Sequence, residues 1–527
     1  MRFLSVNADC FLIELASLEE TLALYNKLQH TQLNGIKDLV PAAKTILVFF
    51  NEIETNFKTL VASIQRLKIA AGFERSGQEV IVPIRYDGED LVQVAELQGL
   101  SVADVIRKHH HSVWNVAFIG FAPGFAYMSS PDKPFTDIPR LTVPRKKIPS
   151  GSLGLAGQYS GIYPKDSPGG WQLIGGTSEK MWDLERKNPA LLLPGMTVHF
   201  EDVTYRPTTV TVPQQITRTV EPKQSLPLFK ITAPSLQMLI QDEGRLNQTK
   251  IGVGMAGAMD LSAMHSANRI VGNPTNTPVI EVLNGGLKAK MQHAAVIAVT
   301  GAISNIRVKF TDGQSADFTS DQPIDLDEGD EFHIQPPTAG LRNYVAVRGG
   351  IDVQPILNSA SFDSLAVLGP EPLKLGDTIY QGQIKAANIS VNEVGKNDLP
   401  KVGDVVELDI VMGPRTDWFE QDSIELLCQQ EWLVTNESNR VGLRLSGAQP
   451  LTRTITHELE SEGTCIGALQ IPPSGQPVLF MNDHPLTGGY PVIAAVAKHH
   501  WDLVAQIPAG CWIKFKKIAE FTDFENK

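Results

Sequence analysis

The most constraining feature of this sequence is the density of glycine and proline over residues 113–177. An apolar, β-branched and aromatic run at 114–121 predicts a strand. Glycine or proline then recurs every few residues, which is too often for a helix and predicts a small barrel or sandwich with tight corners. Basic side chains lie among these turns, at Arg140, Arg145 and Lys146–Lys147. Because glycine lets backbone N–H groups approach a ligand, the stretch suits an anion, the alternative being that the glycines only form corners.

Three pieces of this stretch resemble the signature of the family that contains the B subunit of 5-oxoprolinase, also known as KipI. They are GFAPGFAYM (120–128), PR (139–140) and VPRKKIPSGSLGLAGQYSGIYPKDSPGGWQLIGGT (143–177). The same family supplies part of the carboxyltransferase region of urea amidolyase. The resemblance implies a cyclophilin-like domain at 83–206. We predict ligand contacts from the signature residues Gly120, Phe121, Pro123, Gly124, Phe125, Arg140, Arg145, Pro149, Gly151, Ser152, Gly157, Gly161, Tyr163, Ser167, Pro168, Gly169, Gly170 and Trp171.

Composition narrows the class of protein. Across 527 residues, 58 acidic and 46 basic side chains leave a formal net charge of -12, which argues against nonspecific nucleic acid binding. The four cysteines, Cys10, Cys428, Cys465 and Cys511, lie far apart, so neither a zinc ribbon nor a disulfide scaffold is expected. The start of the chain does not read as a secretory signal, and no apolar run approaches the roughly 18 residues that span a bilayer. These features predict a cytoplasmic protein without membrane contact.

Residues 1–82 predict a small α/β lobe. Short apolar runs at 3–6 and 11–15 predict paired strands, and Ser17 with Glu20 predicts the capped start of a helix. Another strand, a second amphipathic helix and a strand over 80–86 follow. This order indicates a mainly antiparallel sheet with two helices.

Three consecutive histidines, His109, His110 and His111, end the second of two further predicted helices. Adjacent helical residues point about 100° apart and do not share one ion easily, so we predict no metal site. The KipI family has one histidine just before the strand that leads to GFAPGF, and His109 matches it. The resemblance therefore implies a general acid or base at His109, with a buried core histidine as the alternative.

Residues 207–227 are rich in proline, threonine and glutamine and predict a linker. Beyond it, Gly252, Gly254 and Gly257 satisfy the spacing GxGxxG. A dinucleotide site also requires a strand directly before the glycines and βαβ units around them, and both are lacking, so we reject that interpretation. Asp260 is predicted to cap the helix that follows.

The second half resembles the C subunit of 5-oxoprolinase, the KipA family, which is also related to the carboxyltransferase region of urea amidolyase. The matching pieces are IQDEGR (240–245), GAMD (257–260), NRIVGNP (268–274), IEVLNGG (280–286), VAVRGGIDV (345–353), MGPRTDWF (412–419), SNRVGLRLSG (438–447), SEGTCIGALQIPPSGQP (461–477) and DHPLTGGYP (483–491). The chain therefore resembles the 5-oxoprolinase B and C subunits fused end to end, with cyclophilin-like domains at 228–400 and 401–520. The predicted fold class is mainly β with α/β, built from cyclophilin-like barrels and the N-terminal lobe.

Two places depart from the KipA pattern. Residues 361–363 read Ser-Phe-Asp where the family has Ser-Thr-Tyr, and the glycine loop after them is shorter. Residues 484–486 read His-Pro-Leu where the family more often has Arg-Gln-Thr. We therefore expect anion recognition at the terminal motif to be weaker or to come from another residue.

The residues of this half also suggest chemistry by themselves. Arg440 and Arg444 lie four apart in a predicted strand, where an even separation puts both guanidiniums on one face to bind a carboxylate or phosphate. Paired surface arginines in salt bridges are the alternative. Asp483 and His484 put a base beside a glycine turn that can donate N–H groups to an oxyanion. We predict Arg440, Asp483 and His484 as catalytic groups, and ligand contacts from Asp260, Arg444, Thr487, Gly488, Gly489 and Tyr490.

Other catalytic signatures are lacking: the sequence has no GxxxxGK[ST], GxSxG or HExxH, and no biotin attachment turn. The resemblance implies a component of an ATP-dependent 5-oxoprolinase that hydrolyses 5-oxo-L-proline to L-glutamate, using ATP with Mg²⁺ and a separate A subunit. We predict that Arg145 and the turns at 151–161 hold phosphate. Two alternatives stay open, a biotin-dependent carboxyltransferase acting on urea or a similar amide, and a non-catalytic regulator of a sensor histidine kinase. A homo-oligomer is also open.

Overall fold

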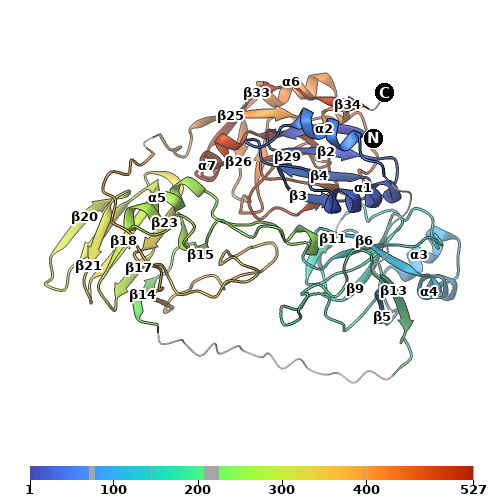
Figure 1. Ribbon diagram of the computed structural model, residues 1–527, viewed down its shortest axis with the longest axis horizontal. Helices are drawn as coiled ribbons and strands as arrows, with labels where there is room; N and C mark the ends of the chain where they lie inside the picture. The colour runs from blue at the N-terminus through green and yellow to red at the C-terminus, as the bar shows by residue number, and fades with distance from the viewer. Residues whose placement is uncertain (70–76, 144, 207–224, 397, 526–527) are drawn as a thin grey trace.

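The computed structural model divides the chain into four β-rich units (Figure 1). It describes residues 1–69, 77–143, 145–206, 225–396 and 398–525. The predicted fold class is confirmed, because antiparallel sheets and a closed barrel dominate and a small α/β lobe begins the chain. The predicted linker lies outside the described residues except for 225–227. Among the described residues, no helix combines the length and the apolar character that crossing a bilayer requires.

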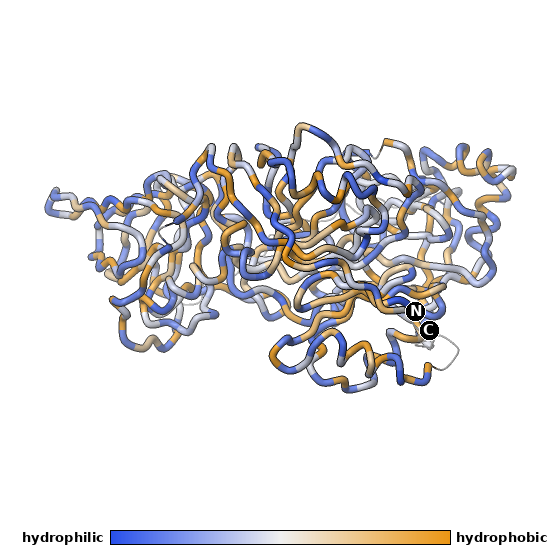
Figure 2. The backbone as a smooth tube through the Cα atoms, turned by 90° about the horizontal axis from the view of Figure 1, so that it is seen from above, coloured by the Kyte–Doolittle hydropathy of each residue, from blue (hydrophilic) through white to orange (hydrophobic). Residues whose placement is uncertain are grey.

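The first unit is a five-stranded sheet in the order β3-β4-β2-β1-β34, with two helices. Its elements are β1 (Arg2–Asn7), β2 (Cys10–Glu14), α1 (Leu18–His30), β3 (Ile36–Pro41), β4 (Thr45–Phe50), α2 (Phe57–Gln65) and β34 (Asp523–Glu525). α1 begins as predicted, because the Ser17 hydroxyl accepts the Glu20 N–H. The fifth strand comes from the far end of the chain, so the two termini lie side by side in both views (Figures 1 and 2). The chain beyond residue 520, the predicted end of the last domain, thus completes the first lobe.

The second unit is a seven-stranded sheet in the order β12-β9-β10-β7-β6-β13-β5. Its elements are β5 (Glu79–Ile84), α3 (Leu91–Gln98), α4 (Val102–His111), β6 (Trp114–Ile119), β7 (Ala126–Ser129), β8 (Arg145–Ile148), β9 (Ser152–Ala156), β10 (Tyr159–Ile162), β11 (Ser167–Gly169), β12 (Gln172–Gly176) and β13 (Thr197–Asp202). The glycine-dense stretch forms its short antiparallel strands. β5 pairs in parallel with β13, so the strand predicted at the end of the first lobe belongs to this sheet instead.

The third unit packs a six-stranded sheet against a five-stranded one around a shared apolar core. Its elements are β14 (Pro227–Ala233), β15 (Gln237–Gln241), η1 (Thr249–Ile251), α5 (Leu261–Val271), β16 (Val279–Leu283), β17 (Lys288–Met291), β18 (Ala295–Ile303), β19 (Asn305–Lys309), β20 (Ser315–Thr319), β21 (Pro323–Leu326), β22 (Glu331–Ile334), β23 (Ala339–Val347) and β24 (Thr378–Tyr380). α5 begins at the predicted cap, where Asp260 accepts the Ala263 N–H.

The fourth unit is a closed barrel in the order β25-β32-β29-β30-β27-β26-β33. Its elements are β25 (Val405–Met412), η2 (Thr416–Trp418), α6 (Gln421–Gln429), β26 (Trp432–Val434), β27 (Gly442–Ser446), β28 (Glu462–Gly463), β29 (Ala468–Gln470), β30 (Val478–Phe480), β31 (Thr487–Gly488), β32 (Val492–Val496), η3 (Lys498–His500), α7 (Trp501–Val504) and β33 (Trp512–Ala519). β28 pairs with β31 outside the barrel.

The first unit is sandwiched between its own helices and the barrel. One face of its sheet packs on α1 and α2, and the other face packs on the barrel, with Leu4 and Leu12 beside Ala468 and Phe480 in one buried cluster. Figure 2 shows apolar segments running through the interior strands and hydrophilic segments on outer loops. The burial of apolar surface between residues more than 400 positions apart therefore fixes the two ends of the chain to each other.

Candidate functional site

A cleft of about 980 Å³ opens where the first unit, the second unit and the barrel meet. Its lining is Glu14, Lys44, Thr45, Tyr127, Lys133, Phe135, Thr136, Asp137, Ile138, Pro139, Arg140, Ala156, Gly157, Gln158, Tyr159, Trp171, Arg415, Trp418, His457, Glu458, Leu459, Glu460, Ser461 and Glu462. Aromatic side chains supply a large part of its walls. A cavity of this size at a junction of domains is a usual place for a small-molecule site.

Arg140 reaches from the second unit toward the barrel at one wall of the cleft. Its Nε lies 3.7 Å from Glu458 Oε2. A Cβ atom built on Gly489 would lie 2.8 Å from Arg140 Nη1, so a side chain at position 489 would displace the guanidinium. The absence of a side chain at Gly489 therefore makes room for Arg140. Among the described residues its ion-pair partner is Glu458 alone, which is largely exposed.

Arg415, Glu14 and Glu462 form the charged floor of the cleft. Arg415 Nη1 lies 2.7 Å from Glu14 Oε1, and Arg415 Nε lies 3.0 Å from both carboxylate oxygens of Glu462. Burial raises the pKa of Glu462. Burial acts in the same direction on Glu14, but its ion pairs with Arg415 and Arg2 lower the pKa of Glu14. This network joins the first unit to the barrel beneath the site.

The predicted motifs of the two halves meet beside the cleft. The Phe121 N–H donates to Thr487 Oγ1 over 3.1 Å, and the Gly124 N–H donates to Ile251 O over 3.2 Å. A Cβ atom on Gly120 would lie 2.4 Å from Thr487 Oγ1, which explains why this position carries glycine. Phe121 has a φ of 63°, a conformation that non-glycine residues adopt at a cost and that concentrates at functional sites.

The signature of the second unit forms mainly an aromatic core. Phe125 lies 5.1 Å from Tyr163 and 5.3 Å from Trp171, ring centre to ring centre, in edge-to-face geometry. Trp171 also lines the cleft, together with Arg140 and Gly157. The other predicted ligand contacts lie outside the lining: Gly120, Phe121, Pro123, Gly124, Phe125, Arg145, Pro149, Gly151, Ser152, Gly161, Tyr163, Ser167, Pro168, Gly169, Gly170, Asp260, Arg444, Thr487, Gly488, Gly489 and Tyr490.

Arg145 and the turns predicted to hold phosphate have other contacts. Arg145 Nη2 lies 2.7 Å from Asp90 Oδ1, and its Nε lies 2.9 Å from Glu89 Oε1. Residues 152–162 form the hairpin of β9 and β10. The charge of Arg145 is thus already balanced by two carboxylates, which does not favour phosphate binding there.

Arg440 and Asp483 form a buried ion pair between the barrel and the third unit. Arg440 Nε and Nη2 lie 2.9 and 3.0 Å from the two carboxylate oxygens of Asp483, and Arg440 Nη1 lies 2.5 Å from Glu281 Oε1. Asp483 also accepts the Ser364 N–H and hydroxyl, over 2.9 and 2.6 Å. Both carboxylate oxygens of Asp483 therefore accept hydrogen bonds, and the carboxylate holds the Arg440 guanidinium in place.

The expectation that Arg440 and Arg444 share one face is wrong. β27 begins at Gly442, so Arg440 lies in the turn before the strand and the alternation of side chains does not extend to it. Arg440 is buried, whereas Arg444 is exposed. Near Asp483, burial and the charge of Asp483 raise the pKa of Asp363 to about 7.

The two predicted histidines lie in packed surroundings. His109 is fully buried, with Nδ1 2.7 Å from Tyr86 Oη and Nε2 3.0 Å from Ser160 Oγ, and burial lowers its pKa to about 3. His484 stacks on Phe480, and burial lowers the pKa of His484. Neither histidine lines the cleft, and the surroundings of His109 favour the core interpretation.

Two family models match the sequence. "Carboxyltransferase domain, subdomain C and D" matches residues 1–192, and "Carboxyltransferase domain, subdomain A and B" matches residues 251–517. The chain belongs to the carboxyltransferase domain family. Within this family it joins a half that is similar to the B subunit of 5-oxoprolinase, the B-like half, to one that is similar to the C subunit, the C-like half, as predicted from the resemblance.

Curated relatives match each half of this carboxyltransferase-domain chain. The C subunit of 5-oxoprolinase from Escherichia coli K12 is 34% identical over 291 residues, which are 55% of this chain and 90% of that protein. The B subunit of 5-oxoprolinase from Bacillus subtilis 168 is 36% identical over 182 residues, 32% of this chain and 75% of that protein. Urea amidolyase of Lachancea kluyveri is 31% identical over 55% of this chain, but only 17% of that protein is covered.

A solved structure shares the architecture of the whole chain. The crystal structure of TTHA0988 superimposes with a TM-score of 0.82 and 28% sequence identity, covering 96% of this chain and 99% of that one. A protein of known crystal structure therefore shares this order of units and carries both halves in one polypeptide.

Several lining residues of this carboxyltransferase-domain chain were missed from the sequence. They are Tyr159, Arg415, Trp418, His457, Glu458 and Glu462. Arg415 and Trp418 stand in MGPRTDWF and Glu462 opens the SEGT segment, so the matched motifs carried a signal that could have pointed to them.

The cleft does not fit the triphosphate of ATP. Five carboxylates and four basic side chains line it. Of the basic groups, Lys44 Nζ lies 3.1 Å from Glu460 Oε2. Arg415 forms ion pairs with the carboxylates of Glu14 and Glu462. A polyphosphate needs a net excess of donors and positive charge, which this lining does not supply.

Proposed function

We propose that this chain is the fused B and C component of an ATP-dependent 5-oxoprolinase, which hydrolyses 5-oxo-L-proline to L-glutamate together with a separate A subunit. The observation that carries the proposal is the cleft itself, because the B-like and C-like halves each supply part of its lining. Relatives of the two halves are named as two subunits of this enzyme. A site divided in this way requires both halves.

The chemistry assigns different parts of the reaction to different chains. An unstrained lactam resists water, and ATP supplies the activation of its carbonyl oxygen. Since the cleft does not fit a triphosphate, we place the nucleotide on the A subunit. This chain would hold and orient the acid.

The lining of the cleft suits a small cyclic amide that carries a carboxylate. Arg140 is the less neutralised of the two arginines in the lining, since Glu458 is 3.7 Å away and largely exposed, and guanidinium binds carboxylate through two parallel hydrogen bonds. Trp171 and Trp418 give an apolar surface for the ring. His457, whose ring centre lies 5.1 Å from that of Trp418, places an imidazole beside this surface that could donate or accept a proton.

The test is glutamate release from 5-oxo-L-proline by this chain mixed with its A subunit, with and without ATP. We expect release only when ATP and both chains are present, and Arg140→Ala should raise KM at least tenfold. Arg107→Ala is the matched control, because Arg107 is exposed on α4 and, within the described part of the chain, forms its ion pair with Asp104 alone. No release with an A subunit that is active beside its own B and C partners would overturn the proposal.

A second candidate function is transfer of a carboxyl group to urea or a similar amide. It is supported by the carboxyltransferase family models and by the similarity to urea amidolyase. Since the sequence has no biotin attachment turn, the biotin would arrive on another protein. Incorporation of labelled bicarbonate that depends on a biotinylated carrier, without glutamate release from 5-oxo-L-proline, would favour this function over the first.

A further inference from the structure

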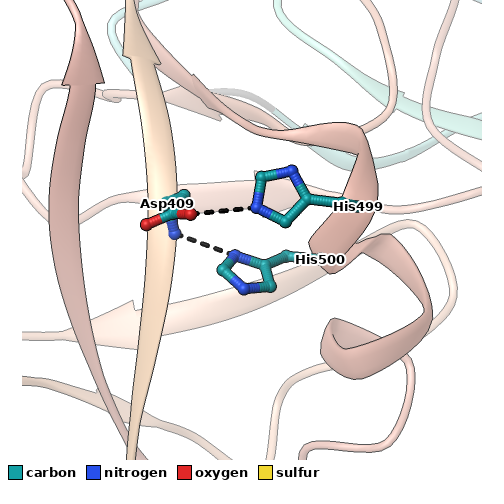
Figure 3. Close-up of side chains that lie close together, drawn as sticks. All are labelled: Asp409, His499 and His500. Carbon is teal, nitrogen blue, oxygen red and sulfur yellow. Dashed lines mark hydrogen bonds and ion pairs between the residues drawn. The ribbon is translucent and has the colours of Figure 1, made fainter.

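Three potential metal ligands meet on the outer side of the barrel, away from the cleft lining. Asp409 lies on β25, and His499 and His500 lie in η3, directly after β32. Their ligand atoms all lie within 4.8 Å of one another (Figure 3). The sequence could not indicate this group, because about ninety residues separate the aspartate from the histidines and the spacing matches no metal motif.

The barrel backbone fixes the position of this group. β25 pairs antiparallel with β32, with Ile410 opposite Val496, and the Ala497 N–H donates to Asp409 O over 2.9 Å. The chain then turns so that both histidines lie over Asp409. The arrangement is therefore a consequence of strand pairing and not of a chance contact between mobile side chains.

The side chains are already oriented toward the carboxylate. His499 Nε2 lies 2.9 Å from Asp409 Oδ2, and the Asp409 N–H donates to His500 Nδ1 over 2.9 Å (Figure 3). The latter bond shows that the lone pair of His500 Nδ1 points toward Asp409. Two ligands on a tetrahedral ion with bonds of about 2.0–2.2 Å lie about 3.4 Å apart, so the 2.9 Å between His499 Nε2 and Asp409 Oδ2 would open by about half an ångström to admit an ion.

We propose that Asp409, His499 and His500 form a binding site for a divalent transition-metal ion of the zinc class. The ion would take the place of the hydrogen between His499 Nε2 and Asp409 Oδ2. From a doubly protonated ring this hydrogen leaves as a proton, and from the neutral ring it moves to Nδ1. His500 Nδ1 would join as the third ligand by giving up the Asp409 N–H. Water would complete the tetrahedral set, because His499 is exposed. Imidazole and carboxylate together favour zinc, nickel or copper over magnesium or calcium.

The surrounding charges set the strength expected of the site. Glu407 and Lys516 lie beside Asp409 on β25 and β33, and Lys498, on the same turn as the histidines, lies 3.3 Å from Asp9. The two nearby carboxylates, Glu407 and Asp9, are balanced by the two cations Lys516 and Lys498, so no excess of negative charge remains outside the ligands. We therefore expect binding that depends on the three ligands and not on the general field.

The site would stabilise a junction of the C-like half. The turn that holds the histidines continues into α7 and on to Gln506. The Leu261 N–H donates to Asp502 Oδ1 over 2.9 Å, and Gln506 Nε2 donates to Asp260 Oδ2 over 2.9 Å. An ion that clamps η3 to β25 would therefore stiffen the contact between the barrel and α5 of the third unit.

The test is a zinc titration of the full chain, freed of any histidine tag and stripped with a chelator, in competition with a chromophoric zinc indicator. We expect one site that Asp409→Asn and His499→Ala each weaken at least tenfold. The matched control is the double variant His110→Ala and His111→Ala. The rings of these adjacent histidines lie 4.1 Å apart and tilted, much like the 4.3 Å of His499 and His500, but they form no ion pair within the described part of the chain. That control should leave the affinity unchanged.

Stability gives a second readout. Zinc should raise the melting temperature of the wild type and leave that of Asp409→Asn unchanged, while circular dichroism without metal should show both chains folded. Repeating the titration with nickel reduces any contribution from the thiols. Equal zinc affinity in the wild type and Asp409→Asn, or loss of affinity in the His110 and His111 control, would show adventitious binding to exposed histidines and overturn the proposal.

Discussion

The backbone N–H of Phe121 donates to the hydroxyl of Thr487 over 3.1 Å, joining residues 366 positions apart. Phe121 belongs to the signature of the B-like half and Thr487 to the terminal motif of the C-like half. Gly120 makes this approach close enough, since a Cβ there would lie 2.4 Å from the hydroxyl oxygen. The two halves are therefore joined through the motifs that identify them.

Replacing Thr487 by valine should loosen this junction. The change keeps the shape of the side chain but leaves the Phe121 N–H without its acceptor, which costs about 1–3 kcal/mol when the donor is shielded from water. We expect a lower free energy of unfolding in urea. Thr487→Ser, which keeps the hydroxyl, should lose much less, and equal loss in the two variants would contradict the role of the hydrogen bond.

Breaking the buried pair of Arg440 and Asp483 should destabilise the chain strongly. Arg440→Met leaves Asp483 and Glu281 without their shared cation in the interior, and breaking such a pair typically costs about 3–5 kcal/mol. Urea unfolding measures the loss. Arg444→Met, at the exposed arginine four residues on, should change stability by less than about 0.5 kcal/mol. Similar values for the two variants would show that Arg440 is not an anchor.

Asp363 should make the chain less stable as the pH rises from about 4 to about 7. Its pKa is raised from 3.8 to about 7 by burial and by the charge of Asp483, so between these values the folded state holds a proton that the unfolded state has lost. The stabilisation is complete below about pH 4 and is lost as the pH rises to about 7. One pKa unit corresponds to about 1.4 kcal/mol, so the effect is a few kcal/mol at most.

The measurement is the free energy of unfolding between pH 5 and pH 8 for the wild type and Asp363→Asn. We expect the difference between the two chains to shift in favour of the asparagine variant as the pH rises. Taking the difference removes the opposite contribution of His109, whose pKa is lowered to about 3 by burial. A difference that does not depend on pH would rule out a shifted carboxyl at position 363.

Ending the chain after Glu520 should destabilise the N-terminal lobe. The change removes β34 from the edge of the first sheet, the 2.7 Å ion pair of Asp523 with Arg2, and Phe524, whose ring centre lies 5.4 Å from that of Phe57. Full burial of a phenylalanine is worth about 1.5–3 kcal/mol, and Phe524, which is partly buried, contributes less than this. Hydrogen exchange should therefore rise in β1 and β2. Phe524→Ala should show part of this effect, and Lys514→Ala, exposed on β33, should show none.

The sequence by itself determined the local secondary structure and the family relationship of both halves. Alternating apolar residues and the Ser17 cap were enough for β1, β2 and α1, because strand and helix periodicity are local properties of the chain. The dense glycines and prolines required short strands with tight corners. Dozens of matched motif positions likewise fixed the fusion of a B-like half to a C-like half.

Only the tertiary structure decided which side chains share a site. Arg140, Trp418 and His457 lie on three separate segments, and no spacing rule relates them. Arg440 and Arg444 show the same limit at short range, since the start of β27 between them decided which is buried. The return of β34 to the first sheet depended on pairing between the two ends of the chain. Such contacts form through burial of apolar surface and pairing of charges between residues hundreds of positions apart. A local sequence pattern does not predict them.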